Sequence, residues 1–267
     1  MKTRTAGAVV GILAVVCIGL VFSVVYPFTT AEPHAANPTG ERFTIGDTDA
    51  YSATGKVVVD GDVQVAFEGV VTADGAWYQK VVQEGVTSEE YRPSPNGTVY
   101  QRLTIDGRDD AEQRREQIVD DDRRTLVRET QNGDTVTFVV EKNASSDGEP
   151  VSGTASVVLN SLSIAGYEHD ESDSSPVTVY EPQAGWYDER KSYRITDASG
   201  AVRANSETGA VNSANVSWAL TTPAGTYAEY ALVTLTDDDP TTHRFSFELD
   251  TDDADLEEPP WVSDLTG

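Results

Sequence analysis

Short apolar runs separated by Asp-Gly or Asn-Gly turns constrain the fold of this chain more than any other feature. In "KVVVDGDVQVAFEGVV" (56–71), Asp60-Gly61 stands between two apolar runs, and the second run alternates apolar and polar residues. Asp-Gly and Asn-Gly favour the tight turns of hairpins, and alternation directs one strand face toward a core. The pattern recurs around Asn132-Gly133 in "RRTLVRETQNGDTVTFVVE" (123–141). The sequence therefore predicts a meandering antiparallel sheet.

Further strand-like runs extend this pattern over most of the chain and give about nine to eleven strands in all. They are predicted at 76–82, 98–105, 192–204, 215–221, 226–236 and 243–250.

Two stretches interrupt the strand pattern. Residues 106–122 are nearly all charged, and Asp109 or Asp110 can cap a short helix there, although a solvated loop fits as well. Residues 152–168 carry apolar side chains at helical spacing. They predict an amphipathic helix lying across the sheet, with a buried strand as the alternative.

A run of 21 uncharged residues, 6–26, precedes the strands. As a helix it would be about 31 Å long, which matches the hydrocarbon core of a bilayer. Lys2 and Arg4 precede the run, and the next basic residue is Arg42. By the positive-inside rule this predicts an uncleaved anchor in the plasma membrane, with a cytoplasmic amino terminus and an extracellular main domain.

Two other interpretations of the apolar run are weaker. Cleavage after Ala31 would treat it as an export signal, but such signals have apolar regions of only about 7–15 residues. Lipidation of Cys17 is disfavoured because Val16 precedes it and apolar residues follow it. The resulting organisation is an anchor at 1–27, an extended stalk at 28–46, a β-rich domain at 47–262 and a tail at 263–267.

The net charge of the chain limits the classes of partner that it can bind. It has 45 acidic and 19 basic residues, with a formal net charge of −26. Self-repulsion of this size is largely screened in molar salt, where the Debye length is about 3 Å. The composition therefore predicts a protein of an extreme halophile, with binding of cations or of a basic partner as the alternative interpretation. Nucleic-acid binding is disfavoured because no basic patch is present.

Three Asn-X-Ser/Thr sequons, at Asn96, Asn143 and Asn215, are candidate glycosylation sites. They agree with an external location. No cysteine occurs outside the apolar run, so the domain has no disulfide.

A search for catalytic chemistry finds no motif. The histidines His34, His169 and His243 form no metal-ligand pair, and the acidic stretch 250–261 fails the EF-hand pattern. A nucleophile elbow, a P-loop and a dinucleotide fingerprint are absent from the sequence. We predict no catalytic, metal or cofactor residues and no cofactor, although an unmarked hydrolase stays open.

Five aromatic residues are candidates for lining an apolar cavity: Trp77, Tyr78, Trp186, Tyr187 and Trp218. Packing in the core is the simpler interpretation of all five.

The stretches "YEPQAGWYDERKSYRITDASGAVR" (180–203) and "EEPPWV" (257–262) resemble haloarchaeal surface proteins with one β-rich domain. Such proteins are similar to the LolA/LppX-like carriers. The resemblance implies a strongly curved antiparallel sheet that cups helices over a hydrophobic cavity. Here the cavity would lie under residues 152–165, and the lipobox cysteine of the family is missing.

The expected fold class is α+β and mainly antiparallel β. It is a strongly curved sheet, or half-barrel, with one or two short helices, after an N-terminal transmembrane helix. The leading function is non-enzymatic binding of an apolar or lipid-like ligand under the curved sheet. The alternative is a structural or protein-interaction component of the cell envelope without a small-molecule ligand.

Overall fold

A computed structural model describes residues 43–143, 150–169, 175–188, 192–221, 239–252 and 254–266, together with positions 224, 230, 232 and 235. The predicted anchor and most of the predicted stalk lie outside these residues. No helix of the described residues has both the length and the apolar character needed to cross a membrane.

The described strands are β1 (Tyr51–Val59), β2 (Asp62–Val71), β3 (Trp77–Gln83), β4 (Val86–Arg92), β5 (Val99–Asp106), β6 (Arg124–Asn132), β7 (Thr135–Lys142), β8 (Gly166–Glu168), β9 (Val177–Gln183), β10 (Gly185–Asp188), β11 (Ser192–Asn205), β12 (Val211–Leu220) and β13 (Thr241–Asp250). The helices with assigned bounds are α2 (Arg108–Val119), α3 (Val151–Leu162) and α5 (Pro260–Thr266).

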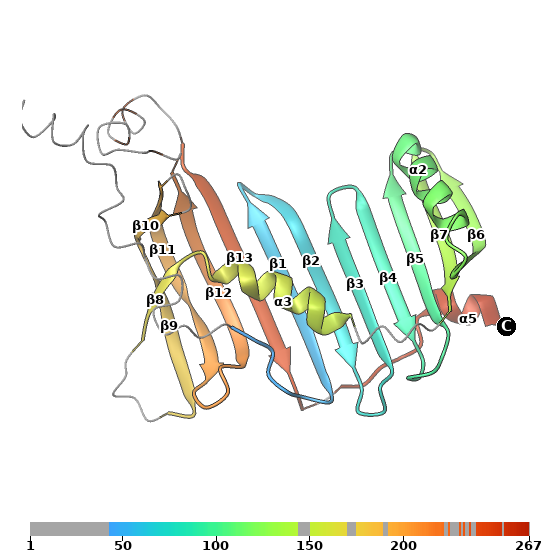
Figure 1. Ribbon diagram of the computed structural model, residues 1–267, viewed down its shortest axis with the longest axis horizontal. Helices are drawn as coiled ribbons and strands as arrows, with labels where there is room; N and C mark the ends of the chain where they lie inside the picture. Colours follow the sequence, from blue (N-terminus) through green and yellow to red (C-terminus); the bar gives the residue numbers. More distant parts are fainter. Residues whose placement is uncertain are drawn as a thin grey trace, which may run out of the picture.

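All thirteen strands belong to one open sheet, as Figure 1 shows. The order is β6-β7-β5-β4-β3-β2-β1-β13-β12-β11-β9-β8, and β10 pairs with β11 beside this path. Every strand pair in the described residues is antiparallel, which confirms the predicted sheet type. The last strand, β13, lies in the middle between β1 and β12 and joins two meanders.

The predicted hairpin turns form for the expected reason. Asp60 and Gly61 both have positive φ, 50° and 94°, and connect β1 to β2. Gly133, with φ 64°, lies in the turn between β6 and β7. Positive φ at these positions matches the twist of the flanking strands and is accessible to Gly and to Asp or Asn.

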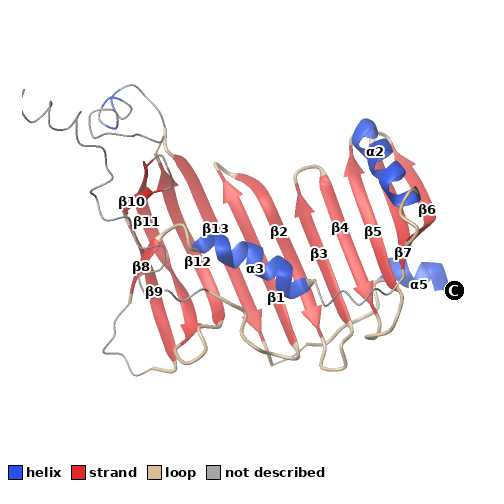
Figure 2. Ribbon diagram, viewed as in Figure 1, coloured by secondary structure: helices blue, strands red, loops and turns tan. Residues whose placement is uncertain are grey.

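Two helices cover one face of the sheet, which we call the helix face (Figure 2). Helix α3 crosses the central strands, and its inward side chains join the main core with Phe67, Phe245 and Phe247. Helix α2 covers β5, β6 and β7, where Ala111 and Ile118 are buried in a second apolar cluster.

A polar network on the helix face involves residues of β3, β4, β5, β7 and α3. Glu90 accepts hydrogen bonds from Gln101, at 2.9 Å, and from Lys142. Gln79 links the network to α3, because Thr154 Oγ1 donates to its side-chain oxygen at 3.2 Å. These side chains satisfy one another's hydrogen-bonding groups, so the sheet can hold charged residues between its two apolar clusters on this face.

The opposite face carries residues 254–266, which we call the C-terminal segment; they include α5. In Figure 1 the chain leaves β13, passes behind the sheet and reaches the ends of β5 and β7. Tyr91, Val139, Trp261 and Val262 form a third apolar cluster there. We call this side the tail face.

Several expectations about local structure need correction. The helix predicted over 152–168 is confirmed as far as residue 162, whereas residues 166–168 form the short strand β8. The helix at 108–119 begins after Gly107, which makes no side-chain cap, so Asp109 and Asp110 occupy the first turn instead of the cap. Carboxylates there still interact favourably with the helix dipole.

One expected element near the C-terminus is wrong. The strand expected at 226–236 is not formed at its described positions Tyr230, Leu232 and Leu235, which are helical. The "EEPPWV" ending runs into helix α5, because proline is well tolerated in the first turn of a helix. The fold therefore has three helices with assigned bounds in its described part, where one or two were expected.

Residues just before β1 take part in the domain. Phe43 is buried and contacts Tyr167 and Tyr180 edge to face, with ring centroids 5.2 and 5.6 Å apart. Thr44 forms a parallel bridge with Ala210. Phe43 and Thr44 therefore pack with the β-rich domain.

Candidate functional site

The space between α3 and the sheet is filled with side chains. Val151, Ala155, Val158, Leu159 and Leu162 are each 0% exposed. The helix lies so close to β2 that a Cβ atom added at Gly69 would be 2.4 Å from Cγ1 of Val151. Interlocking of this kind is ordinary core packing. The place where the ligand cavity was predicted is thus a packed interface.

The five predicted aromatic residues lie in different parts of the structure. Trp218 is fully buried and stacks on Phe245 with ring centroids 4.5 Å apart. Trp77 is also buried in the main core, with the guanidinium of Arg92 5.5 Å from its ring centroid. Trp186 and Tyr187 belong to β10, and their side chains lie outside the described residues. Both described tryptophans of the set are core residues.

Tyr78 is the exception, because it lies on the tail face in a row of tyrosines. Tyr78 on β3 is in register with Tyr91 on β4, which is in register with Tyr100 on β5. Burial is the main cause that raises the pKa of the Tyr78 hydroxyl above its ordinary value, and the charge of Glu89 adds to it. Burial also raises the pKa of Tyr91, with a smaller contribution from Glu258. This row forms an aromatic floor.

A row of alternating charges runs beside the tyrosines. Glu68, Lys80, Glu89 and Arg102 are in register on β2, β3, β4 and β5. Lys80 Nζ lies 3.6 Å from Glu68 Oε1, and Arg102 forms an ion pair with Glu89. Tyr78 donates a hydrogen bond to Glu89 Oε1 at 3.2 Å. Glu89 is therefore held from both sides, with a side chain only 10% exposed.

The C-terminal segment covers part of these two rows. Trp261 is 8% exposed, and the guanidinium of Arg102 lies 5.4 Å from its ring centroid. Arg128 of the edge strand β6 donates to the carbonyl of Asp264 at 3.3 Å. Aromatic and cationic contacts thus hold the segment to the sheet.

A groove of about 550 Å³ remains between this segment and the sheet, and we call it the tail groove. It is lined by Val70, Tyr78, Glu89 and Arg102 from the sheet and by Asp255, Leu256, Glu257, Glu258, Pro259, Pro260 and Trp261 from the segment. Its volume lies within the range of about 300–1,000 Å³ that is usual for ligand sites. The tail groove is our candidate functional site.

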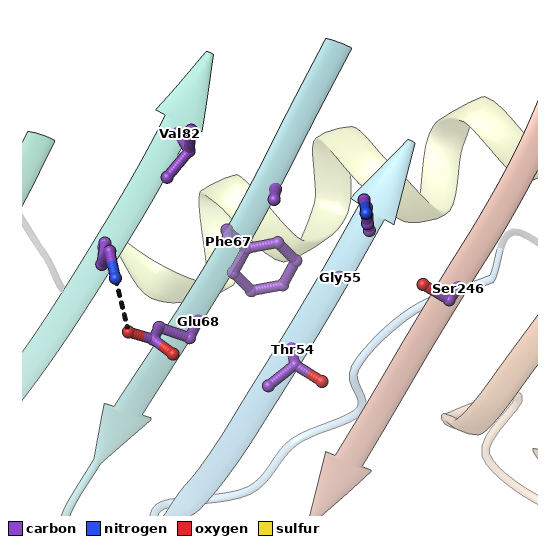
Figure 3. A pocket seen from close by; sticks show the side chains of 9 residues that line it. Thr54, Gly55, Phe67, Glu68, Val82 and Ser246 are labelled. Carbon is purple, nitrogen blue, oxygen red and sulfur yellow. Dashed lines mark ion pairs between the residues drawn. The ribbon is translucent and has the colours of Figure 1, made fainter. Parts of the chain in front are cut away.

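A second, shallower hollow lies on the same face over the middle of the sheet (Figure 3). It measures about 300 Å³ and is lined by Thr54, Gly55, Lys56, Ala66, Phe67, Glu68, Lys80, Val82 and Ser246. Figure 3 shows α3 behind the strands, so this hollow opens away from the helix. The small residues Ala66 and Ser246 leave the strands uncovered here, which makes this a surface and not an enclosed site.

The three sequon asparagines are all exposed. Asn96 lies in the turn before β5, Asn143 follows β7, and Asn215 points outward from β12. Attachment of a glycan at these positions stays a prediction, and the surface location that it requires is present.

Metal ligation finds no support in the described part of the chain, where no group of three or more His, Cys, Asp or Glu side chains could hold an ion. His243 is half-buried, and burial lowers the pKa of its imidazole while Asp60 opposes this shift. His169 lies against Tyr180 with ring centroids 5.0 Å apart. His34 lies outside the described residues.

Comparison with protein-family models, with curated proteins and with solved structures gave no match.

Sequence reasoning missed most residues of the tail groove. Alternation in "TSEEYR" (87–92) and "VYQRL" (99–103) could have placed Glu89 and Arg102 on one face with the tyrosines. No comparable signal shows that Trp261 packs against strands more than 120 residues earlier in the chain.

Proposed function

We propose that this chain is a membrane-anchored domain that faces the exterior and binds another protein of the cell envelope without catalysing a reaction. The observation that carries this proposal is the packing of α3, whose five inward side chains are fully buried on the sheet. A carrier of an apolar ligand needs an enclosed apolar space, whereas an interaction domain needs an accessible surface. The filled space under α3 and the hollowed tail face together favour the interaction domain.

Several parts of this proposal rest on the sequence. They are the anchor at 6–26 with its cytoplasmic amino terminus, the stalk at 28–46, the halophilic origin, and the LolA-like relationship with its half-barrel curvature. The apolar or lipid-like ligand stays as the competing prediction, and it requires a site other than the packed space under α3.

Photo-cross-linking in cells tests the interaction. A photoreactive amino acid replaces Thr54 in the shallow hollow of the tail face, or Val157 on the outer side of α3, in the full-length chain. Both side chains are exposed, so neither replacement disturbs the core. We expect a discrete cross-linked protein from position 54 and none from position 157.

Native mass spectrometry of the full-length chain in detergent provides the opposing test. An apo mass agrees with the interaction domain. A stoichiometric apolar adduct that disappears on solvent extraction, combined with no cross-linked protein, would overturn the proposal in favour of the ligand carrier.

A further inference from the structure

The tail groove has a charge that differs from its floor to its rim. On the floor, Glu89 is neutralised by Arg102. On the rim, Asp255, Glu257 and Glu258 are exposed and take part in none of the ion pairs found within the described residues. The rim thus presents three uncompensated carboxylates to an incoming group. Such a rim favours a cation.

The rest of the groove is apolar and aromatic. Val70 and Tyr78 form its sheet side, and Leu256, Pro259 and Trp261 face them from the C-terminal segment. An occupant must therefore carry apolar surface next to its positive charge. A hydrated metal ion lacks such surface, and an aliphatic lipid tail lacks the charge.

We propose that the tail groove binds an extended segment of a partner protein through one basic side chain flanked by apolar residues. The basic group lies against Asp255, Glu257 and Glu258, and the apolar neighbours lie against Tyr78 and Trp261. This inference rests on the proposed interaction function and names the chemistry of its partner.

Fluorescence anisotropy with the full-length chain in detergent tests the inference. The probe is the labelled peptide acetyl-Leu-Arg-Leu-amide, and the same peptide with citrulline in place of arginine is the neutral control. Phenethylamine serves as a competing free amine. We expect saturable binding of the arginine peptide, weaker binding of the citrulline peptide, and little competition by the free amine.

A charge variant locates the site. The double substitution Glu257→Gln with Glu258→Gln should weaken the affinity for the arginine peptide about fivefold, because the two exposed charge contacts that it removes contribute about 0.5 kcal/mol each. Glu112→Gln with Glu116→Gln on the exposed side of α2 removes the same charge elsewhere and should leave the affinity unchanged. Both variants change exposed side chains, and unfolding curves verify that they fold.

Three results would overturn the inference. They are no saturable binding, equal affinity for the citrulline peptide, and displacement of the peptide by phenethylamine at similar concentration, which would indicate a site for free amines. None of them affects cross-linking from position 54, which lies outside the tail groove. Failure of the groove assignment is therefore distinguishable from failure of the interaction function.

Discussion

The two faces of the sheet are covered in contrasting ways. On the helix face, α3 lies flush on the strands, and the space beneath it is packed. On the tail face, the C-terminal segment contacts the strands through Trp261, Val262 and Leu256, and a hollow of about 550 Å³ remains beside it. Strands β2 and β3 thus support a closed core on one side and an open site on the other.

The difference has a simple physical cause. A helix satisfies its own backbone hydrogen bonds, so it can present a continuous apolar stripe to a sheet. The stretch 254–259 is irregular and carries three carboxylates, whose hydration keeps it from closing on the sheet. A site therefore forms where the covering segment is too polar to pack closely.

Truncation of the helix stripe should have the largest effect. Leu159→Ala removes a fully buried side chain between α3 and the sheet, and we expect a loss of about 3 kcal/mol in the free energy of unfolding. Denaturant unfolding measures it, with Val157→Ala at a 62% exposed position as the control. A loss below that of the control would mean that the helix face is not closed.

Close approach of α3 to β2 can be tested at two glycines. Gly69→Ala places a Cβ atom against Val151 and should destabilise the fold by about 2 kcal/mol through overpacking. Gly153→Ala, within α3 and with open space around it, should stabilise the helix by about 1 kcal/mol. If the two substitutions changed the free energy of unfolding in the same direction, the result would contradict the close contact between α3 and β2.

Loosening the C-terminal segment should affect only the tail face. Trp261→Ala removes the main apolar contact of the segment, and we expect its local opening to become easier by about 1.5 kcal/mol. Hydrogen exchange should accelerate in residues 254–266 and stay unchanged in α3. Faster exchange throughout both regions would show that the two faces open as one unit.

The smallest effect concerns a tyrosine at the end of α3. Tyr167 donates to the carbonyl of Leu162 at 2.9 Å, and Tyr167→Phe should reduce stability by about 1 kcal/mol. Burial raises the pKa of this hydroxyl above its ordinary value of 10.0. Because the folded state holds the proton more tightly, this contribution is full below pH 10 and decreases as the pH rises further.

Unfolding curves on both sides of pH 10 measure this effect. The wild-type chain should lose more stability than Tyr167→Phe over that interval. Parallel losses in the two proteins would mean that Tyr167 ionises freely in the folded state.

Particular residues show how far the sequence could predict this fold. The turns at Asp60-Gly61 and Asn132-Gly133 were predictable because their backbone preference is local. Helix α3 was predictable from its spacing, although the same residues also fitted a buried strand. The strand expected at 226–236 failed at its described positions, where tertiary context overrides local preference.

The candidate site was harder to predict than the fold. Tyr78 was among the predicted aromatics, but Trp77 beside it points to the opposite face and belongs to the core. Glu89, Arg102 and Trp261 carry no motif, because their role depends on which segments meet.

By itself, the sequence determined the antiparallel strands, their turns, the amphipathic helix and the acidic surface, all of which follow from local backbone preference and residue alternation. Only the tertiary structure decided that β13 joins two meanders beside β1, that α3 leaves no room beneath it, and that the C-terminal segment forms a groove with β2 to β5. These contacts link residues far apart in the chain, and their formation depends on the packing of the whole sheet.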